Sequence, residues 1–389
     1  MNFPRYVIII FLFPVFLLAS QFAQFGDLVS ATIDSSATYS TTSNVYKTPT
    51  KTADNYFIWS PGLKFDLGYG DSNFDLSLKL AYDMYRYQEL SNLDSDLLTA
   101  MLYGSYRGAV TQVLFHYGIN EGQSAQADLT GQSSSNFQDL IQTKNEFYSI
   151  KADYRYSPKI SFSGGINASD FTYTTYTDQY ASKKSFTVPL EVFYHYSTKL
   201  SGFYGLEFRH REIGQAFNGD GNYEADSIYY KLGLRGELKP KIDGNVSVGI
   251  RNIEYSNEDT ENYDRKYKET FGIRTDLKWR VSPKFISLLN TTRDYDTAGS
   301  GNSYHQTRVR LLNRYLINSE FSLSADAIVT SKKFVSGSRR TDEMNRYTLN
   351  LDYFPDEYSN FTVGYGFVDS RAISKYNESG FNFKISVLY

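Results

Sequence analysis

Tight turns flanked by alternating apolar and polar residues recur through the second half of this chain. Before the turn at Ser197, every second residue from Phe186 to Tyr196 is apolar, and after it the same holds from Leu200 to Phe208. Successive side chains of a β-strand point to opposite faces, so each run has one apolar and one polar face. The turns lie at Ser157–Lys159, Ser197–Lys199, Lys239–Lys241, Ser282–Lys284, Ile317–Ser319 and Pro355–Glu357. Pro, Ser, Asn and Asp favour such turns, so the repeating unit is predicted to be a β-hairpin.

The connections between successive hairpins are longer and polar. They include Asn120–Thr143, Tyr173–Lys183, Glu212–Tyr223, Ser256–Arg265, Asp296–Ser303 and Ser331–Glu343. Short turns therefore collect at one end of the predicted sheet and long loops at the other, which is typical of outer-membrane β-barrels. A soluble sandwich has no reason to segregate loop lengths so regularly, and a propeller blade would place four strands in each repeat of this length.

The N-terminal third follows the same scheme less regularly. Its first strand is predicted at Ala31–Thr41 and its second at Asn55–Gly68, although Pro61 interrupts the latter. The whole chain is predicted to be all-β, a transmembrane antiparallel up-and-down barrel of about 18 strands, within a range of roughly 16 to 18. We expect one barrel domain at residues 24–389, with both of its ends on the short-turn side.

The composition fits a barrel better than a bundle of membrane helices. The mean hydropathy is −0.44, and beyond the first residues no apolar run is long enough for a membrane-spanning helix. A polar average is expected for a barrel, because only every second strand residue faces lipid. The 35 Tyr and 28 Phe suit the aromatic girdles of the two membrane interfaces. The chain has no Cys, which excludes disulfides, and its net charge of −3 gives no sign of a nucleic-acid partner.

Residues 1–23 have the pattern of a secretory signal peptide. Arg5 precedes a short apolar run from Val7 to Leu18, which is followed by small and polar residues. The predicted location is the Gram-negative outer membrane, with the N- and C-termini in the periplasm. Expected partners are outer-membrane lipid, including lipopolysaccharide, and the barrel-assembly machinery.

Charged residues share the strand face opposite the apolar rows. A dry core would not accept so many charges, so this face is predicted to line a hydrated lumen. The candidate lumen charges are Asp153, Glu207, Arg209, Arg211, Arg235, Arg274, Asp276, Arg308 and Arg310. Two interpretations stay open: a field that favours anionic or polar, sugar-like solutes, or charges that pair with one another across strands.

Neither catalysis nor a cofactor is predicted. Of the four histidines, only His210 is placed near the long-loop rim among charged neighbours, as a rim-active enzyme would require. The acidic stretch Asn257–Asn262 lacks the glycine and terminal glutamate of a calcium loop, so no metal site is predicted there.

Several turn motifs resemble those of the β-barrel porin 2 family. The matching segments are Ile58–Leu63, Tyr154–Lys159, Val188–Leu190 and Gly236–Lys241, whereas Thr198 and Ile317–Ser319 depart from the motif. The resemblance covers residues from about 30 to the C-terminus and implies an outer-membrane barrel. It also implies an association with exopolysaccharide systems, and hence polysaccharide export components as partners. The expected function is a porin-like channel for small polar or anionic solutes or glycan, and the alternative is a non-conducting accessory barrel of an exopolysaccharide system.

The last residues are predicted to close the barrel against Ala31–Thr41. Phe381, Phe383, Ile385, Val387 and Tyr389 alternate with polar residues. An open sheet edge cannot lie in lipid, and the aromatic end resembles the signal that the barrel-assembly machinery recognises.

Deletion of Phe383–Tyr389 is therefore expected to abolish membrane-inserted protein, because the seam between the first and last strands would be lost. Heat-modifiable migration of membrane fractions in gels measures the folded barrel. Normal assembly of the truncated chain would show that this segment does not close the barrel.

Overall fold

The computed structural model describes residues 23–25, 29–68, 73–131, 137–216, 221–256, 267–335 and 340–388. Apart from Ala23, the predicted signal peptide lies outside these residues. The acidic stretch Asn257–Asn262 and the terminal Tyr389 also lie outside them.

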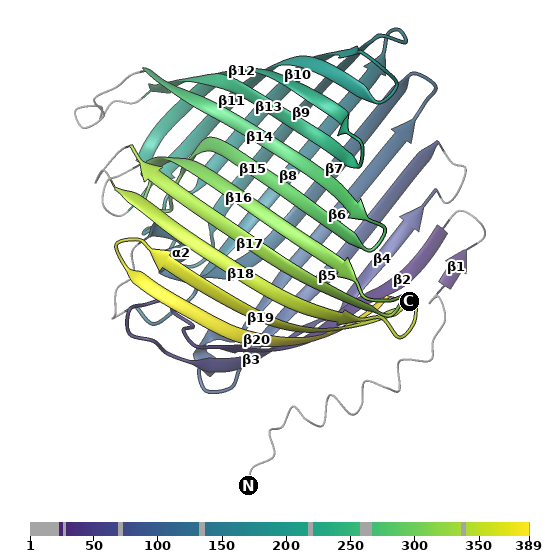
Figure 1. Cartoon of the computed structure of the whole chain (residues 1–389). Helices are drawn as coiled ribbons and strands as arrows, with labels where there is room; N and C mark the ends of the chain where they lie inside the picture. Colours follow the sequence, from purple (N-terminus) through teal and green to yellow (C-terminus); the bar gives the residue numbers. More distant parts are fainter. Residues whose placement is uncertain are drawn as a thin grey trace.

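The described residues form one continuous antiparallel sheet that closes on itself (Figure 1). Its strands are β1 (Ala23–Phe25), β2 (Val29–Thr42), β3 (Asp54–Ser60), β4 (Gly62–Leu67), β5 (Phe74–Tyr87), β6 (Ser95–Arg107), β7 (Thr111–Ser124), β8 (Ile141–Arg155), β9 (Ile160–Tyr173), β10 (Lys183–His195), β11 (Leu200–Gln215), β12 (Gly221–Lys239), β13 (Ile242–Ser256), β14 (Tyr267–Ser282), β15 (Phe285–Thr297), β16 (Ser303–Leu316), β17 (Phe321–Phe334), β18 (Thr341–Tyr353), β19 (Ser359–Arg371) and β20 (Lys375–Leu388). The helical elements are a 3-10 turn, η2 (Ser91–Leu93), and the short helix α2 (Gln126–Thr130).

The wall of the barrel has eighteen strand positions. β1 pairs only with the first residues of β2, while β3 and β4 together occupy one position, since both pair with β2 and β5. Pro61 separates β3 from β4 because it has no backbone N–H to donate. The register is the same on both sides of it, and the Pro61 carbonyl still accepts a hydrogen bond from Tyr82 at 3.1 Å. The predicted fold class is thus confirmed.

The barrel closes where the sequence predicted it. β20 pairs with β2 from Leu388 opposite Asp34 to Asn382 opposite Ser40. Phe381 and Phe383 are exposed on the outer face, Ile385 is half-buried and Val387 is buried.

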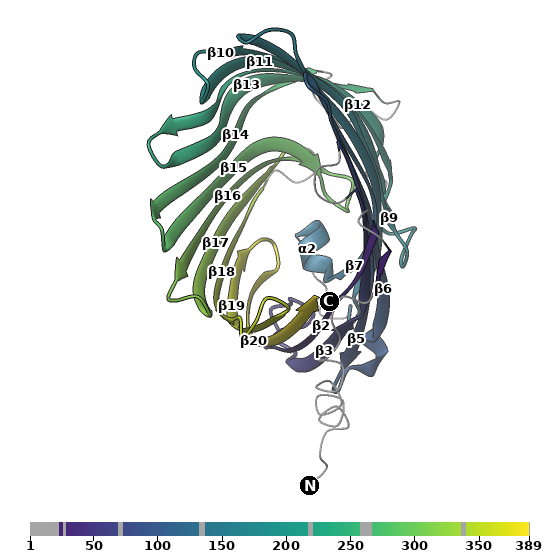
Figure 2. The same cartoon turned by 90° about the vertical axis from the view of Figure 1, so that its right-hand side faces the viewer.

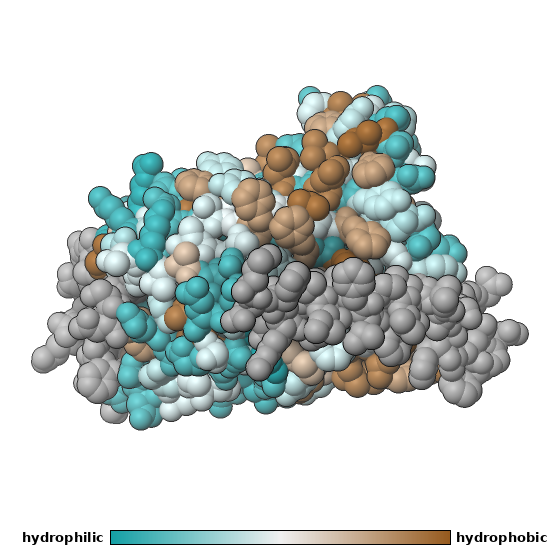
Figure 3. Space-filling view, turned by 90° about the horizontal axis from the view of Figure 1, so that it is seen from below, coloured by the Kyte–Doolittle hydropathy of each residue, from teal (hydrophilic) through white to brown (hydrophobic). Residues whose placement is uncertain are grey.

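Side chains alternate between the two faces of the wall as expected. On β10, for example, Leu190 and Val192 are exposed on the outer face, whereas Glu191 between them forms an ion pair with Lys231 of β12 on the inner face. Seen from below, hydrophobic residues gather toward the middle and the short-turn side, and the long-loop side is more hydrophilic (Figure 3). Among the described residues, no helix is long and apolar enough to cross a membrane.

Most of the short turns share one pattern of hydrogen bonds between a side chain and the backbone. The hydroxyl of Ser157 accepts hydrogen bonds from the backbone N–H groups two and three residues later, and Ser197 and Ser282 repeat this arrangement. Asn318 and Asp356 do the same with a side-chain oxygen. In each of these turns a Ser, Asn or Asp side chain supplies the cap, which explains why neither Thr198 nor the Ile317–Ser319 turn disturbs the series.

Strands extend further toward the long loops than the sequence indicated. β7 continues to Ser124, β11 to Gln215 and β17 to Phe334, where loops were expected to begin at Asn120, Glu212 and Ser331. The expected loop boundaries were wrong because they followed the loss of apolar alternation. Backbone pairing does not depend on side-chain polarity, so the ladder continues past the apolar band.

Arginine at Leu349, which is exposed on the outer face of β18, should destabilise the barrel by about 2–4 kcal/mol. The matched control, Thr348→Arg on the inner face beside Asp326, should change stability by less than about 1 kcal/mol, because a hydrated lumen tolerates charge. Urea unfolding in lipid vesicles measures both. Equal destabilisation would contradict the assignment of the two faces.

Candidate functional site

Two segments fold into the lumen from the long-loop end. One is the connection between β7 and β8, which carries α2, and the other is the tip of the β15–β16 hairpin, residues 294–304. Viewed from the short-turn side, α2 lies inside the ring of strands and the β15–β16 hairpin curls toward it (Figure 2). The sequence predicted Asn120–Thr143 to be the longest loop but gave no sign that it folds inward.

The α2 segment is attached to several parts of the wall. Asp128 forms an ion pair with Lys47 at 2.5 Å and accepts a hydrogen bond from the Tyr376 hydroxyl at 3.0 Å. The carbonyl of Thr130 accepts a hydrogen bond from Arg340 at 2.7 Å. The carbonyl of Leu129 accepts one from the backbone of Gly299, at the tip of the second segment. The two inward-folded segments therefore support each other.

Local sequence explains why the α2 segment turns back on itself. Gly131 ends the helix with φ of +71°, a left-handed conformation that glycine adopts without strain. A Cβ at this position would meet the carboxylate of Asp342 at 2.2 Å. Beside the helix, Ala125 and Leu140 pack with Val45 and Tyr87, so the ends of the segment are held by apolar contacts.

Charge and hydrogen bonding hold the neighbouring loops. Burial by itself lowers the pKa of Lys47, but the carboxylates of Asp128 and Glu378 outweigh it, so the pKa is raised. Lys47 therefore stays charged at neutral pH, and its contribution to docking is lost only as the pH rises through that raised pKa. On the opposite side of the segment, the hydrogen bond that Tyr176 donates to Asp139 raises the pKa of Tyr176 to about 12.

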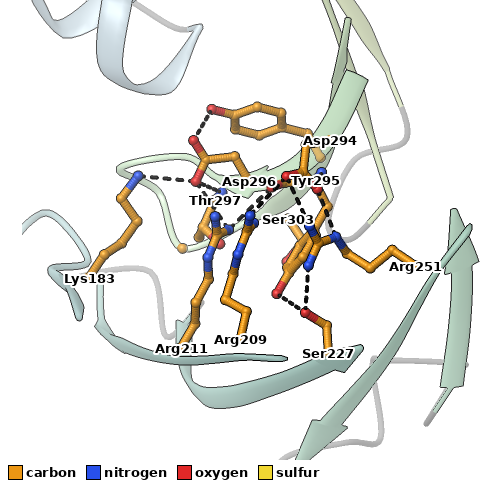
Figure 4. Close-up of polar contacts among 12 residues, drawn as sticks. Lys183, Arg209, Arg211, Ser227, Arg251, Asp294, Tyr295, Asp296, Thr297 and Ser303 are labelled. Atoms are coloured by element: carbon orange, nitrogen blue, oxygen red, sulfur yellow. Dashed lines mark hydrogen bonds and ion pairs between the residues drawn. The ribbon is translucent and has the colours of Figure 1, made fainter. Parts of the chain in front are cut away.

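The hairpin tip is held by a buried network of acids and arginines (Figure 4). Asp294 accepts from Arg209 at 3.0 Å and pairs with Arg251 at 3.0 Å. Asp296 pairs with Arg211 at 3.3 Å and with Lys183 at 3.2 Å. Each acid of the tip thus meets two cations of the barrel wall.

Arg251 is the most enclosed member of this network. It is 1% exposed, and it contacts Glu207 at 2.7 Å as well as Asp294. Its guanidinium also lies over the ring of Tyr229, 4.6 Å from the centroid, and donates to Ser227 at 3.1 Å. A buried guanidinium with all of these partners is well compensated for its lost hydration.

The predicted lumen charges all lie on the inner parity, but their surroundings differ. Arg209, Arg211 and Glu207 belong to the buried network, Arg310 pairs with Asp326 at 2.8 Å, and Asp153 lies 3.5 Å from Lys151. Asp276 accepts a hydrogen bond from Asn290 at 2.7 Å, and Arg235 lies over the ring of Phe193. Arg274 and Arg308 have no carboxylate within ion-pair distance among the described residues. Ion pairs therefore occur along the whole wall, whereas Arg274 and Arg308 keep no acidic partner among the described residues.

A cavity of about 570 Å³ lies along the inner wall formed by β8 to β14. Its lining includes Lys231, Arg235 and Arg274 together with Glu191 and Asp276. The volume is in the range typical of small-molecule sites.

Asp294, Asp296, Lys183 and Arg251 were not among the predicted site residues. The first two lie where β15 leaves the wall, and no periodicity in the sequence marks that bend. Arg251 was visible on the charged parity, but its burial depends on the hairpin that covers it.

The histidine considered for a rim-active enzyme faces outward. His210 lies on the outer face, where Nδ1 is 2.8 Å from Asp226 and Nε2 is 3.6 Å from Glu212. It cannot act on a solute in the lumen from this position. Within the described ranges, no group of three or more His, Asp and Glu side chains could hold a metal ion.

The molecule is thus an all-β closed antiparallel barrel of eighteen strand positions, apolar outside and charged inside. No family model matches the chain, and no curated protein matches its sequence. The family resemblance suggested by the turn motifs therefore has no matching model behind it.

Similar strand arrangements occur in solved structures. OccK9 (OpdG) of Pseudomonas aeruginosa is 11% identical, with a TM-score of 0.49 over 92% of this chain and 98% of that chain. A BenF-like porin from Pseudomonas fluorescens Pf-5 is 10% identical, with a TM-score of 0.47 over 94% and 100%. The outer membrane channel DcaP of Acinetobacter baumannii is 13% identical, with a TM-score of 0.44 over 94% and 99%. These likenesses are too distant to bear on the function of this chain.

Replacing Arg251 by Met should release the hairpin tip, because Glu207 and Asp294 each lose a buried cation. A loss of about 3 kcal/mol would speed amide hydrogen exchange of residues 294–304 about 100-fold. Exchange read by mass spectrometry measures this. The control, Arg310→Met, breaks an ion pair outside the tip and should leave the exchange of residues 294–304 unchanged. Unchanged exchange in the Arg251 variant would show that the network does not hold the hairpin.

Proposed function

We propose that this chain is an outer-membrane channel that admits small polar solutes and favours anions. The observation that carries the proposal is the separation of charge between the two faces of a closed wall. Apolar side chains cover the outside, whereas the inner parity bears charged residues along a cavity of about 570 Å³. A wall of this kind suits lipid on one side and water on the other.

The arrangement of turns supports an orientation. The beginning of β2 and the end of β20 lie at the end of the barrel that carries the short turns (Figure 1). In outer-membrane barrels the short turns are periplasmic and the long loops extracellular. Both ends of the barrel would then be periplasmic, which fits the signal peptide predicted at residues 1–23.

The preference for anions follows from the charges that remain after pairing. The acids at the hairpin tip neutralise Arg209, Arg211 and Arg251 near the long-loop end. Closer to the short turns, Arg274 and Arg308 keep no ion-pair partner among the described residues. A solute anion that passes the inward-folded segments would meet these free guanidinium groups.

The alternative is a barrel that does not conduct. The α2 segment and the hairpin tip contact each other inside the lumen, which a plugged accessory barrel would also show. An exopolysaccharide role for such a barrel stays a prediction from the turn motifs.

Single-channel recording in a planar bilayer with a KCl gradient tests the proposal. The wild-type protein should conduct and show a reversal potential on the anion-selective side. Arg274→Glu together with Arg308→Glu should move that potential toward cation selectivity, because two free lumen cations become acids.

The matched control is Lys333→Glu, which makes the same type of charge change on the outer face of β17. It should leave the reversal potential unchanged. Cation preference in the wild type would exclude the anion channel, and absence of any conductance would favour the accessory barrel.

A further inference from the structure

The inner wall opposite the charged network carries an exposed aromatic stack. Tyr103 of β6 is 44% exposed although it lies on the inner parity, directly opposite His116 of β7. The two rings are nearly parallel, with centroids 4.3 Å apart, and Phe147 of β8 meets the edge of His116 at 4.8 Å. Such stacking fixes the plane of the tyrosine ring.

A glycine makes this stack possible. A Cβ at Gly118 would lie 2.5 Å from the Phe147 ring and 2.6 Å from the sulfur of Met101. Both side chains therefore occupy the space above this glycine, which brings Phe147 against His116. His116 Nε2 is buried without a hydrogen-bond partner, so ring contacts rather than polar bonds hold this histidine.

One side of Tyr103 is left open. On the side away from His116, its partner across the ladder is Ser77 of β5, whose side chain is small. Among the described residues, Tyr103 makes no ring contact besides the one with His116. A flat apolar surface is thus presented to the lumen, next to a polar wall.

Polar groups continue from this stack in a straight line across the sheet. Successive ladder partners give the order Ser77, Tyr103, His116, Ser149, Asn167, Thr187 and Arg209, which we name the Tyr103 row. Ser149 donates to the Asn167 oxygen at 2.6 Å, which leaves the amide nitrogen of Asn167 as a donor. Asn167 is exposed and lines the cavity of about 570 Å³.

The length and direction of the Tyr103 row suit an elongated ligand. Neighbouring strands are about 4.8 Å apart, so roughly 14 Å separate the backbones of Tyr103 and Asn167. This exceeds one sugar ring and matches a short chain of them. Barrel strands are tilted, so a row perpendicular to them climbs the wall, here from the short-turn half toward Arg209 beneath the hairpin.

We propose that the Tyr103 row binds a short, flat oligosaccharide, with one pyranose ring stacked on Tyr103 and hydroxyl groups of a later ring bonded to Asn167. This inference rests on the proposed channel function and names a solute class for it. A pyranose with equatorial hydroxyls has apolar C–H faces and a polar edge, which match an aromatic ring followed by amide and hydroxyl groups. An aromatic acid fits less well, because the row offers many hydroxyl partners, while Arg209 at its end is buried in ion pairs.

Isothermal titration calorimetry of the refolded, detergent-solubilised barrel tests the site with cellotriose, whose β-linked rings form a flat ribbon. Cellotriose should bind more tightly than glucose. Tyr103→Ala should weaken cellotriose binding about tenfold, because one stacking ring is lost. Tyr103→Phe keeps the ring and should bind within about twofold of the wild type.

A matched control is Tyr148→Ala, which removes an exposed tyrosine from the outer face of β8. It should leave cellotriose binding unchanged, provided that heat-modifiable migration shows a folded barrel. Absence of cellotriose binding, equal binding by the wild type and Tyr103→Ala, or tighter binding of benzoate than of cellotriose would overturn the proposal.

Calorimetry does not depend on conduction, so the two proposals fail separately. A barrel that conducts KCl but binds no cellotriose keeps the channel function and loses the sugar site. A barrel that binds cellotriose through Tyr103 without conducting keeps the site and loses the channel.

Discussion

The structure depends on the pairing of every strand edge. Backbone N–H and C=O groups cannot be left unsatisfied in hydrocarbon, so a sheet that crosses a membrane must close. Here the closure is the ladder between β2 and β20, which joins the first and last strands of the wall. Even Pro61, which cannot donate, lies between two strands that keep one register with their neighbours. Once the backbone of the wall is fully paired, the side chains of the outer and inner faces can differ in polarity.

Polar residues of different kinds occupy different regions of the inner face. Toward the long loops, arginines meet the acids of a hairpin that folds inward, and Arg251 and Glu207 of this network are buried. Below it, Arg274 and Arg308 remain without acidic partners among the described residues. Across the lumen, β6 to β8 carry rings and small polar groups together with the Lys151–Asp153 pair. The two sides of the inner wall therefore differ in chemistry. A solute passing through the lumen would contact both.

The two inward-folded segments link the wall to the lumen. Asp128 joins the α2 segment to Lys47 and Tyr376, while Asp294 and Asp296 join the hairpin to the arginines. A backbone hydrogen bond between Leu129 and Gly299 connects them. Their position depends on these charged and polar contacts together with small apolar clusters, such as the one that holds Ala125 and Leu140. Such contacts can be altered one at a time without disturbing the closed wall.

The sequence by itself determined the wall. Alternation, capped turns and the parity of charge are local properties with a period of two, so they define strands, hairpins, faces and the closing strand. Only the tertiary structure decided what fills the lumen. The pairing of Asp294 with Arg209, the burial of Arg251 and the seat of α2 each join segments far apart in the chain. The stack of Tyr103 on His116 likewise needs the register between two strands and the missing side chain of Gly118. Contacts across a barrel leave no periodic trace in the sequence, because they depend on how loops fold back after the wall has closed.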